Sequence, residues 1–413
     1  MLRLRAPTTP EPAAADASSR RMAGAGGAAV SSAPVALLAL ASIVPLAAGP
    51  PAPRPRAREA GVVTGILPAG PLNTITDVAG VRVGHVTLIE GDDVRTGVTV
   101  VLPHGGNVFR EKVPAAVFVA NGFGKLTGVT QVEELGTLET PIAMTGTLNT
   151  WRVADAVVDW VLALPGNEDV LSVNPVVGEC NDGSLSAIRR RPVGREHVLA
   201  ALAAAAPGPV AEGSVGAGTG TECMGFKGGI GTASRRLPGA LGGWTVGVLV
   251  QTNLPGALTV AGVPVGVALG RTPFRMELAE EHGSCMVVVA TDAPVDARQL
   301  RRMAARTPLG LARAGASAGH GSGDYAIAFT AHPQLRVGHG AKEVTGRPLL
   351  ADTDLSPLLL AVIEATEEAV LNSVFRATTV KGFRGHEAEA LPLEPVLELL
   401  RERRALTEPR AAP

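Results

Sequence analysis

A serine stands directly before an apolar run in the segment Gly283-Ser284-Cys285-Met286-Val287-Val288-Val289-Ala290. A short, continuous apolar run is typical of a strand that is buried on both faces. A serine at the first position of such a strand, behind a glycine, is the arrangement expected of an autoproteolytic N-terminal nucleophile, because glycine permits a strained backbone in which the hydroxyl attacks the preceding carbonyl. A loop serine before a strand fits the same pattern, so the segment alone leaves both interpretations open.

Cleavage of the bond between Gly283 and Ser284 would give the serine a second role. An N→O acyl shift followed by hydrolysis would leave Ser284 as a new N-terminus. Its α-amine, with a reference pKa of about 7.7–8.0, would be partly neutral near pH 7 and could act as a base.

Around this segment, strands and helices are expected in groups rather than in strict alternation. Apolar runs and periodicity predict strands at residues 81–89, 97–102, 115–120, 244–250, 286–290 and 325–330, and helices at 151–164, 199–206, 296–313, 356–374 and 395–401. Ser356 is expected to cap its helix, with Pro357 in the first turn. The grouping indicates an α/β protein in which layered sheets are covered by helices, rather than a doubly wound parallel sheet. We expect a single domain over residues 61–405.

Composition excludes several classes of protein. Gly 50 and Pro 32 are numerous but aperiodic, which excludes collagen, and 46% hydrophobic residues exclude a largely disordered chain. Aromatic residues make up only 3%, so Val, Leu, Ile and Ala must build the core. A net charge of -1 gives no reason to expect nucleic acid as a partner, and no stable membrane span is expected.

Cysteine and histidine do not form a metal-binding pattern. Cys180, Cys223 and Cys285 are too few for a disulfide scaffold or a zinc ribbon, and Cys285 is expected to be a buried small hydrophobe. The histidines are dispersed without ligand spacing, among them His85, His104 and His320. We therefore expect no metal and no other cofactor.

Residues 1–60 differ from the rest of the chain. They are rich in Ala, Pro, Ser and Arg, and they contain the pair Arg20-Arg21, an apolar stretch at 35–48 and a small-residue end. This order is typical of a secretory signal peptide, and the Arg pair resembles a twin-arginine signal. A disordered extension that targets nothing is the alternative. We expect an exported, periplasmic or extracellular protein and exclude the segment from the fold.

A glycine-rich run at residues 213–221 invites comparison with phosphate-binding loops. No Gly-Lys-Ser/Thr follows at the Walker spacing, and no clear strand precedes the run. A close backbone approach or a series of tight turns is the better interpretation.

Several motifs together resemble one known family, that of the L-aminopeptidase D-amidase/D-esterase and the β-peptidyl aminopeptidases, which are autoproteolytic serine peptidases of the N-terminal nucleophile type. The motif Gly319-His320-Gly321-Ser322-Gly323-Asp324-Tyr325 is one of the matches. The matching segments follow the family's order at residues 75–85, 95–98, 119–125, 133–136, 177–179, 225–231, 250–253, 283–284, 319–325 and 377–379. A match over this length is far more specific than any single motif.

The resemblance implies a four-layer α/β/β/α sandwich, similar to N-terminal nucleophile hydrolases but differently connected. It also implies self-cleavage into residues 61–283 and 284–413, which stay associated, and assembly into a homo-oligomer, a tetramer in the family. The implied activity is removal of an N-terminal residue from small peptides, amides or esters, without a metal.

The resemblance also assigns roles to individual residues. Ser284 matches the nucleophile, Asn253 a residue of the oxyanion hole, and Ser322 and Asp324 a second serine and an acidic residue that support the nucleophile. An Asn amide can donate to a tetrahedral oxyanion, and a serine–carboxylate pair can orient an amine. Many family members carry Glu where this chain has Asp324, which is one methylene shorter. Without the resemblance, Asn253 would be read as a turn residue and the other pair as loop caps.

Substrate recognition is expected at two further residues. Glu179 lies where the family has an acidic residue near the substrate pocket, and a partly buried carboxylate binds an ammonium strongly. Asn181, two positions on, is aromatic in some relatives, so their substrate preferences do not transfer to this chain.

Two other functions remain open at this point. One is an acyltransferase related to the ornithine acetyltransferases, which share the fold but are expected to cleave before threonine. The other is a non-catalytic homologue used for binding or assembly, against which the presence of Ser284, Asn253, Ser322 and Asp324 argues.

Overall fold

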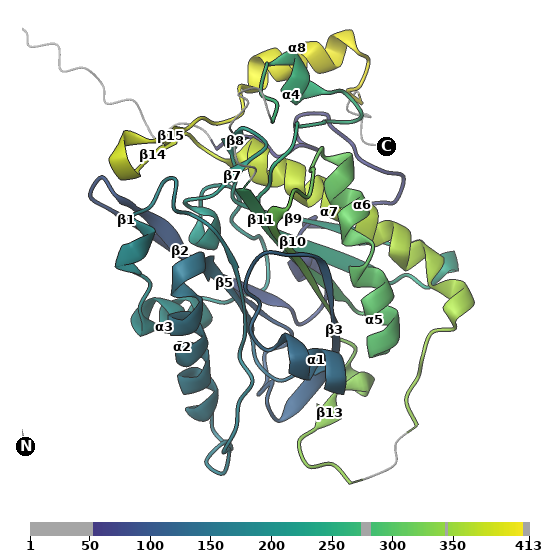
Figure 1. Ribbon diagram of the computed structural model, residues 1–413. Coiled ribbons are helices and arrows are strands. Elements are labelled where there is room, and N and C mark those ends of the chain that lie inside the picture. Colours follow the sequence, from purple (N-terminus) through teal and green to yellow (C-terminus); the bar gives the residue numbers. More distant parts are fainter. Residues whose placement is uncertain (1–52, 274–281, 343–345, 408–413) are drawn as a thin grey trace, which may run out of the picture. The chain divides into compact units, whose positions relative to one another are not determined.

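The computed structural model describes residues 53–273, 282–342 and 346–407, and the chain from Ala52 to Pro413 forms one compact unit (Figure 1). The expected signal segment falls almost wholly outside the described residues, and export stays a prediction. Residues 53–60, which the sequence analysis excluded, belong to the fold. Ala57 is fully buried, and Arg58 forms a 2.6 Å ion pair with Glu368.

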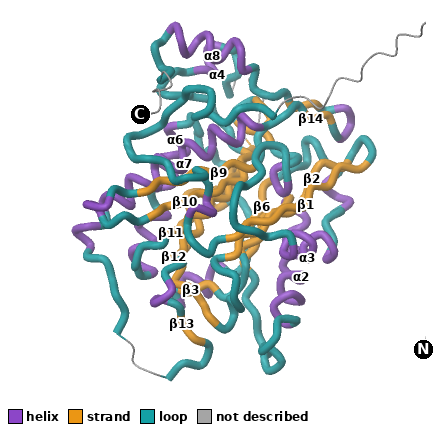
Figure 2. The backbone as a smooth tube through the Cα atoms, turned by 180° about the vertical axis from the view of Figure 1, so that it is seen from behind, coloured by secondary structure: helices purple, strands orange, loops and turns teal. Residues whose placement is uncertain are grey.

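Two sheets form the centre of the molecule (Figure 2). The first has the order β1 (Arg82–Glu90), β2 (Val94–Leu102), β5 (Ile142–Gly146), β6 (Val176–Cys180). The second has the order β13 (Val337–Gly338), β3 (Glu111–Gly122), β12 (Gly321–Thr330), β11 (His282–Thr291), β10 (Thr245–Asn253), β9 (Ile230–Arg236), with β4 (Thr137–Leu138) paired to β3. Each sheet is mixed, because β5 and β6 run parallel in one, and β11 and β12 run parallel in the other.

Helices cover the outer face of each sheet. The first sheet packs against α2 (Thr150–Leu162) and α3 (Arg195–Ala203), and the second against α5 (Ala297–Ala304), α6 (Thr307–Arg313) and α7 (Ser356–Arg376) (Figure 1). The shorter elements are α1 (Val129–Leu135), α4 (Val265–Ala268), α8 (Leu393–Glu402), β7 (Glu222–Cys223), β8 (Phe226–Lys227), β14 (Val380–Lys381) and β15 (Glu387–Ala388).

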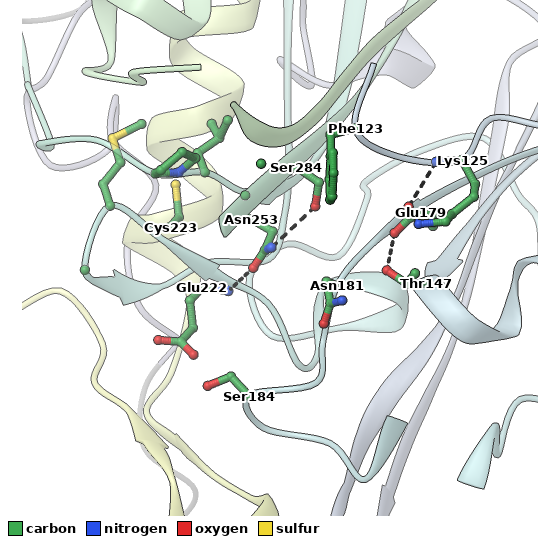
Figure 3. Close-up of a pocket in the computed structure, with 16 residues that line it drawn as sticks. Phe123, Lys125, Thr147, Glu179, Asn181, Ser184, Glu222, Cys223, Asn253 and Ser284 are labelled. Carbon is green, nitrogen blue, oxygen red and sulfur yellow. Dashed lines mark hydrogen bonds and ion pairs between the residues drawn. The ribbon is translucent and has the colours of Figure 1, made fainter. Parts of the chain in front are cut away.

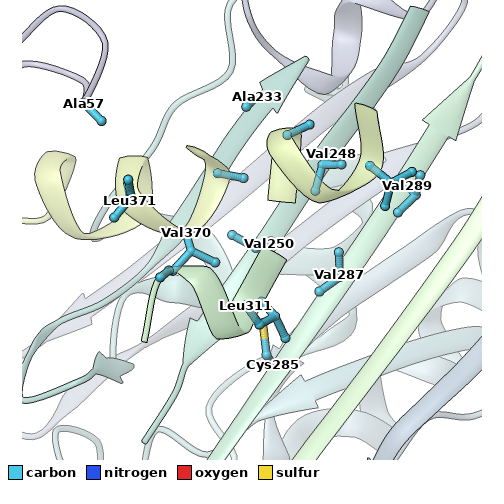
Figure 4. Close-up of a cluster of buried hydrophobic side chains, with 14 of the residues drawn as sticks. Ala57, Ala233, Val248, Val250, Cys285, Val287, Val289, Leu311, Val370 and Leu371 are labelled. Carbon is cyan, nitrogen blue, oxygen red and sulfur yellow. The ribbon is translucent and has the colours of Figure 1, made fainter. Parts of the chain in front are cut away.

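Among the residues that the structure describes, three separate hydrophobic cores correspond to the three interfaces between the layers. One contains Val98 and Val157, between the first sheet and its helices. The second lies between the two sheets and contains Met144 and Val288. The third lies between the second sheet and α5–α7 (Figure 4). The predicted four-layer α/β/β/α sandwich is therefore confirmed.

The alternation along β11 explains why its sequence is apolar throughout. Met286 and Val288 point into the core between the sheets, whereas Cys285 and Val287 point to the helices, because successive side chains of a strand face opposite sides. Ser284 has the parity of Met286, so it faces the first sheet. The predicted buried strand is confirmed, and Cys285 is a fully buried free thiol as expected.

Two helix predictions need correction. The helix expected at 296–313 is broken into α5 and α6, and Pro308 lies in the first turn of α6, where its missing N–H does no harm. Ser356 is the first residue of α7 and not its cap, a position that belongs to Leu355. Neither difference changes the layer order.

The glycine-rich run serves as a close backbone approach, as the sequence indicated. A Cβ on Gly218 would lie 2.5 Å from the backbone of Gly229 and Ile230. Lys227, fully buried behind the run, donates from Nζ to the carbonyls of Gly218, Thr221 and Gly228 at 2.8–2.9 Å. Burial lowers the pKa of Lys227 to about 7. The lysine therefore fixes the loop from within.

Candidate active site

A cavity of about 480 Å³ opens at the end of β10 and β11, where both sheets contribute residues (Figure 3). This volume is in the range of small-molecule sites. Its lining comprises Phe123, Lys125, Thr147, Glu179, Asn181, Ser184, Glu222, Cys223, Met224, Gly225, Asn253, Leu254, Pro255, Gly283, Ser284 and Gly321. Of the predicted site residues, Ser284, Asn253, Gly283, Glu179 and Asn181 thus meet at one place.

Ser284 and Asn253 are placed by the sheet itself. They are register partners on the antiparallel strands β11 and β10, and Asn253 Nδ2 donates to Ser284 Oγ at 3.3 Å. Ser284 is only 3% exposed. The candidate nucleophile and the candidate oxyanion donor are therefore held next to each other by backbone pairing.

The orientation of the Asn253 amide is fixed on its other side. The backbone N–H of Glu222 donates to Asn253 Oδ1 at 3.1 Å. Because that oxygen is occupied as an acceptor, the NH₂ group must face Ser284 (Figure 3). A turn residue would not need this arrangement, whereas an oxyanion donor does.

A glycine is needed at position 283 because there is no room for a side chain, and not because the backbone is strained. It is not among the residues with positive φ, and its backbone continues β11. A Cβ at this position would lie 2.2 Å from Pro255 Cδ. The expected backbone strain at Gly283 is therefore absent. The glycine is needed instead because the Pro255 ring leaves no room for a side chain before Ser284.

Ser322 and Asp324 lie on β12, the parallel neighbour of β11. Ser322 is the register partner of Gly283, and its Oγ donates to Asp324 Oδ1 at 2.8 Å. Asp324 has the parity of Ala326, which packs toward the helices, so the pair lies on the sheet face opposite the Ser284 side chain. Burial raises the pKa of Asp324, although the bond from Ser322 opposes this. The pair therefore stands beside the peptide bond between Gly283 and Ser284, not beside the Ser284 hydroxyl.

Glu179 is 3% exposed near the end of β6 in the first sheet. Its Oε1 accepts the backbone N–H of Lys125 at 3.0 Å and lies 3.6 Å from Lys125 Nζ, while Oε2 accepts the Thr147 hydroxyl. A carboxylate has about four acceptor positions, so these contacts orient it and leave capacity for a ligand in the cavity.

Asn181 lines the cavity, but its side chain is also used locally. It is exposed, and its Oδ1 accepts the backbone N–H of Gly183 at 2.9 Å, which closes a turn. Its NH₂ group remains available to a ligand.

Several lining residues had no role in the sequence analysis, namely Phe123, Thr147, Glu222, Met224 and Pro255. Phe123 is 61% exposed, with its ring 5.9 Å from that of His320. These residues come from separate segments with no common spacing, so no periodic signal could have grouped them. The run 119–125 did contain Phe123 and Lys125, but only as part of the resemblance.

The histidines singled out in the sequence have structural contacts. His85 Nδ1 lies 2.9 Å from Thr99 Oγ1, and burial lowers the pKa of His85 to about 4. His104 accepts the N–H of Gly106 and contacts the carbonyl of Glu111. Within the described ranges, no group of three or more His, Cys, Asp and Glu side chains is placed to hold a metal ion. Likewise, no helix in those ranges has both the length and the apolar character needed to cross a membrane.

Comparisons with known proteins identify relatives of this chain. The chain is 40% identical over 387 residues to the β-peptidyl aminopeptidase BapA of Sphingosinicella microcystinivorans, covering 87% of this chain and 96% of the relative. It superimposes on a Burkholderia sp. β-aminopeptidase with a TM-score of 0.77 and 42% identity, over 84% of this chain and 98% of that one.

A second solved structure describes the fold class. The L-aminopeptidase D-Ala-esterase/amidase of Ochrobactrum anthropi matches with a TM-score of 0.79 and 36% identity, over 86% of this chain and 100% of that one. It is described as a prototype for the serine aminopeptidases and as a new variant among the Ntn hydrolase folds. The family model of peptidase family S58 matches residues 73–388. With this match over most of its length, the chain belongs to peptidase family S58.

Proposed function

We propose that this chain cleaves itself before Ser284 and then acts as a serine aminopeptidase on short peptides, amino-acid amides or esters. One observation carries the proposal: a buried serine hydroxyl lies 3.3 Å from an Asn amide whose opposite end is held by a backbone N–H, and both line a cavity of ligand size. Membership of a family of serine aminopeptidases supports the same activity. The names of the relatives add N-terminal β-amino acids to the substrates worth testing.

In the self-cleavage step, Ser284 Oγ adds to the carbonyl carbon of Gly283 and the peptide C–N bond breaks. The released nitrogen keeps its own hydrogen and takes the proton lost from Oγ, so it becomes the α-amine of Ser284, while an ester joins Gly283 to Oγ. Water then hydrolyses the ester, which gives a Gly283 carboxylate and a free Ser284 hydroxyl. Packing of Pro255 against Gly283 supports this step, because it limits the positions that the attacked carbonyl can take.

In turnover, the new α-amine takes the Oγ proton as Oγ attacks the substrate carbonyl, and Asn253 Nδ2 donates to the developing oxyanion. Ser322 and Asp324 hold the α-amine, because Ser322 is the register partner of Gly283 and so lies where the amine is released. The amine then returns the proton to the leaving group, and water hydrolyses the acyl-enzyme. One chain thus supplies nucleophile, base and oxyanion donor.

Glu179 binds the free ammonium of the substrate, and Asn181 contributes its NH₂ group at the cavity mouth. Lys125 and Thr147 already orient the buried Glu179 carboxylate, so ligand binding does not carry the entropy cost of ordering this side chain. This contact distinguishes an aminopeptidase from an endopeptidase, since it requires a free amino group next to the scissile bond.

The two fragments, residues 61–283 and 284–413, remain associated as one catalytic domain. The first fragment contributes β3 and β10, and the second contributes β12 and β11, which lie between them in the sheet. Strand β11 pairs with β10 from Val246 to Asn253, and β12 pairs with β3. Separating the fragments would expose the cores on both faces of the second sheet. The proposal also includes assembly into a homotetramer, which the family resemblance suggests. It includes export of the protein, which the composition of residues 1–60 suggests.

Intact-mass measurement tests the proposal without a choice of substrate. The wild-type protein is expected to yield a fragment of 130 residues that begins at Ser284, and Ser284→Ala is expected to stay full length and to hydrolyse no amide. Ser317→Ala, outside the cavity lining, is the matched control and should cleave normally. An uncleaved wild type that still hydrolyses amino-acid amides would show that Ser284 is not the nucleophile.

A further inference from the structure

Two carboxylates line the cavity, and they differ in their partners. Glu179 is held by Lys125 and Thr147, as described above. The side chain of Glu222 is partly exposed and makes no hydrogen bond or ion pair with any residue in the part of the chain that the structure covers. A carboxylate without a partner at the edge of a ligand-sized cavity is available to a cationic ligand.

The position of Glu222 relative to the reacting atoms is fixed by its own backbone. Its N–H donates to Asn253 Oδ1, so Glu222 stands directly behind the oxyanion donor. Figure 3 shows its carboxylate on the side of Asn253 away from Ser284, with Glu179 beyond Ser284 on the other side. The two carboxylates therefore flank the nucleophile and its oxyanion donor.

This arrangement determines which part of a substrate reaches Glu222. In the tetrahedral intermediate, the carbonyl carbon carries Oγ of Ser284, the oxyanion at Asn253, the Cα that leads to the free amine, and the leaving group. If the amine is bound at Glu179, the Cα substituent points to that side, and the leaving group must point away from it. Glu222 is the carboxylate of the cavity lining that lies on that side.

We propose that Glu222 selects leaving groups that carry a positive charge, so that a peptide with Lys or Arg as its second residue is cleaved in preference to a neutral or acidic one. This inference rests on the proposed aminopeptidase function and adds a substrate class to it.

The charges around Glu222 support the selection. Lys125, the cation in the cavity lining, lies against Glu179 instead. Lys227 interacts electrostatically with Glu222, but it is fully buried and its ammonium donates to three carbonyls, so it forms no ion pair with Glu222. Arg271 forms its ion pair with Glu389. The negative charge of Glu222 is therefore not neutralised by these cations, and it attracts a cationic ligand in the cavity and repels an anionic one.

The test compares kcat/KM for C-terminally amidated dipeptides that differ in one charge. The leaving-group arm uses Ala-Lys, Ala-norleucine and Ala-Glu amides, and the first-residue arm uses Lys and norleucine amides. Wild-type enzyme is expected to cleave Ala-Lys amide about three- to tenfold faster than Ala-norleucine amide, with Ala-Glu amide slowest, and added salt should reduce the difference.

Two variants show whether Glu222 is the cause. Glu222→Gln should remove the preference, because the backbone bond to Asn253 is kept while the charge is lost. Glu222→Lys should reverse it in favour of Ala-Glu amide, a result that misfolding cannot produce. Glu90→Gln, an exposed carboxylate at the end of β1, is the control and should keep the preference.

The outcomes separate the inference from the function on which it rests. Cleavage of all amides without regard to the leaving-group charge, or a charge preference confined to the first residue, would overturn the role of Glu222 and leave the aminopeptidase function standing. Failure of these amides and of the matching β-alanyl amides to react would overturn the aminopeptidase function itself, and the role of Glu222 with it.

Discussion

The two sheets supply the cavity in different ways. In the second sheet, Ser284 and Asn253 occupy paired positions on adjacent strands, so a continuous backbone ladder sets their separation. In the first sheet, Glu179 depends on Lys125, from the loop after β3, and on Thr147, from the turn after β5. Strand pairing therefore sets the positions of Ser284 and Asn253 relative to each other, whereas the carboxylate of Glu179, itself on β6, is oriented by groups from segments at strand ends. Loops vary more easily than paired strands, so we expect specificity to change more readily than chemistry.

The largest expected effect lies in the second sheet. Asn253→Ala removes the amide proposed to donate to the oxyanion, so kcat should fall by about 10²–10³ with little change in KM. Steady-state kinetics on an amino-acid amide measures the effect in protein already shown by mass to be cleaved. Unchanged kcat would mean that the bond from Glu222 to Asn253 serves only to close a turn.

A smaller effect on a different kinetic constant is expected in the first sheet. Glu179→Gln keeps the shape and removes the charge proposed to bind the substrate ammonium, so KM for amino-acid amides should rise about thirtyfold, which corresponds to about 2 kcal/mol. An N-acylated ester of the same side chain, if it is cleaved, should be little affected. Glu134→Gln, an exposed position on α1, is the control.

Two results would contradict this assignment of Glu179. Equal loss on the amide and on the N-acylated ester would indicate a structural role. Failure of the variant to cleave itself would place Glu179 in maturation instead of recognition, and would weaken the division between the two sheets.

The third prediction concerns the proposed self-cleavage site. Gly283→Ala places a methyl group 2.2 Å from Pro255 Cδ, and a proline ring cannot move aside as a flexible side chain would. Self-cleavage should slow about tenfold, in line with the typical cost of overpacking. A denaturing gel followed over time measures the rate. Gly239→Ala, where the new Cβ meets nothing within 4 Å, should cleave at the wild-type rate; equal rates for both variants would contradict steric confinement by Pro255.

The smallest expected effect comes from a buried carboxyl just after β6. Asp182 follows β6, is fully buried, and its two oxygens have no hydrogen-bond partner among the described residues. Burial raises its pKa from 3.8 to about 7. The folded state thus holds a proton that the unfolded state releases, so this group makes folding less favourable as pH rises from about 4 to about 7.

Asp182→Asn removes that titration. The melting temperature of the variant relative to wild type should therefore rise by a few degrees between pH 5 and pH 8. Asp92→Asn, an exposed residue in the turn between β1 and β2, is the control and should show no such trend. A pH-independent difference between Asp182→Asn and wild type would mean that Asp182 does not titrate in this range.

The sequence predicted much of the architecture because its strongest signals are local. The continuous apolar run before Ala290 required a strand buried on both faces, and the helix at 356–374 was found within two residues of its end at Arg376. The break between α5 and α6 was missed because the apolar positions keep a helical spacing across it. The start of β3 at Glu111 was missed because its first residues are polar and include a proline.

The residues of the candidate site also differ in how far the sequence could predict them. The resemblance selected Ser284, Asn253 and Glu179, which the structure brings to one cavity, and it selected Ser322 and Asp324, which the structure places on the other face of the sheet. Glu222 carried no signal, because its contact with Asn253 is made by a backbone N–H that any residue type could provide.

By itself the sequence determined that residue 283 is a glycine, that a serine follows it, and that the strand after this serine is apolar on both faces. Those properties are covalent or depend on a period of two residues. Only the tertiary structure decided that Asn253, 31 residues earlier, faces Ser284, and that Glu179 reaches the same cavity from the other sheet. The physical reason is that strand register and sheet packing are set jointly by the three hydrophobic cores, whose members come from the whole chain.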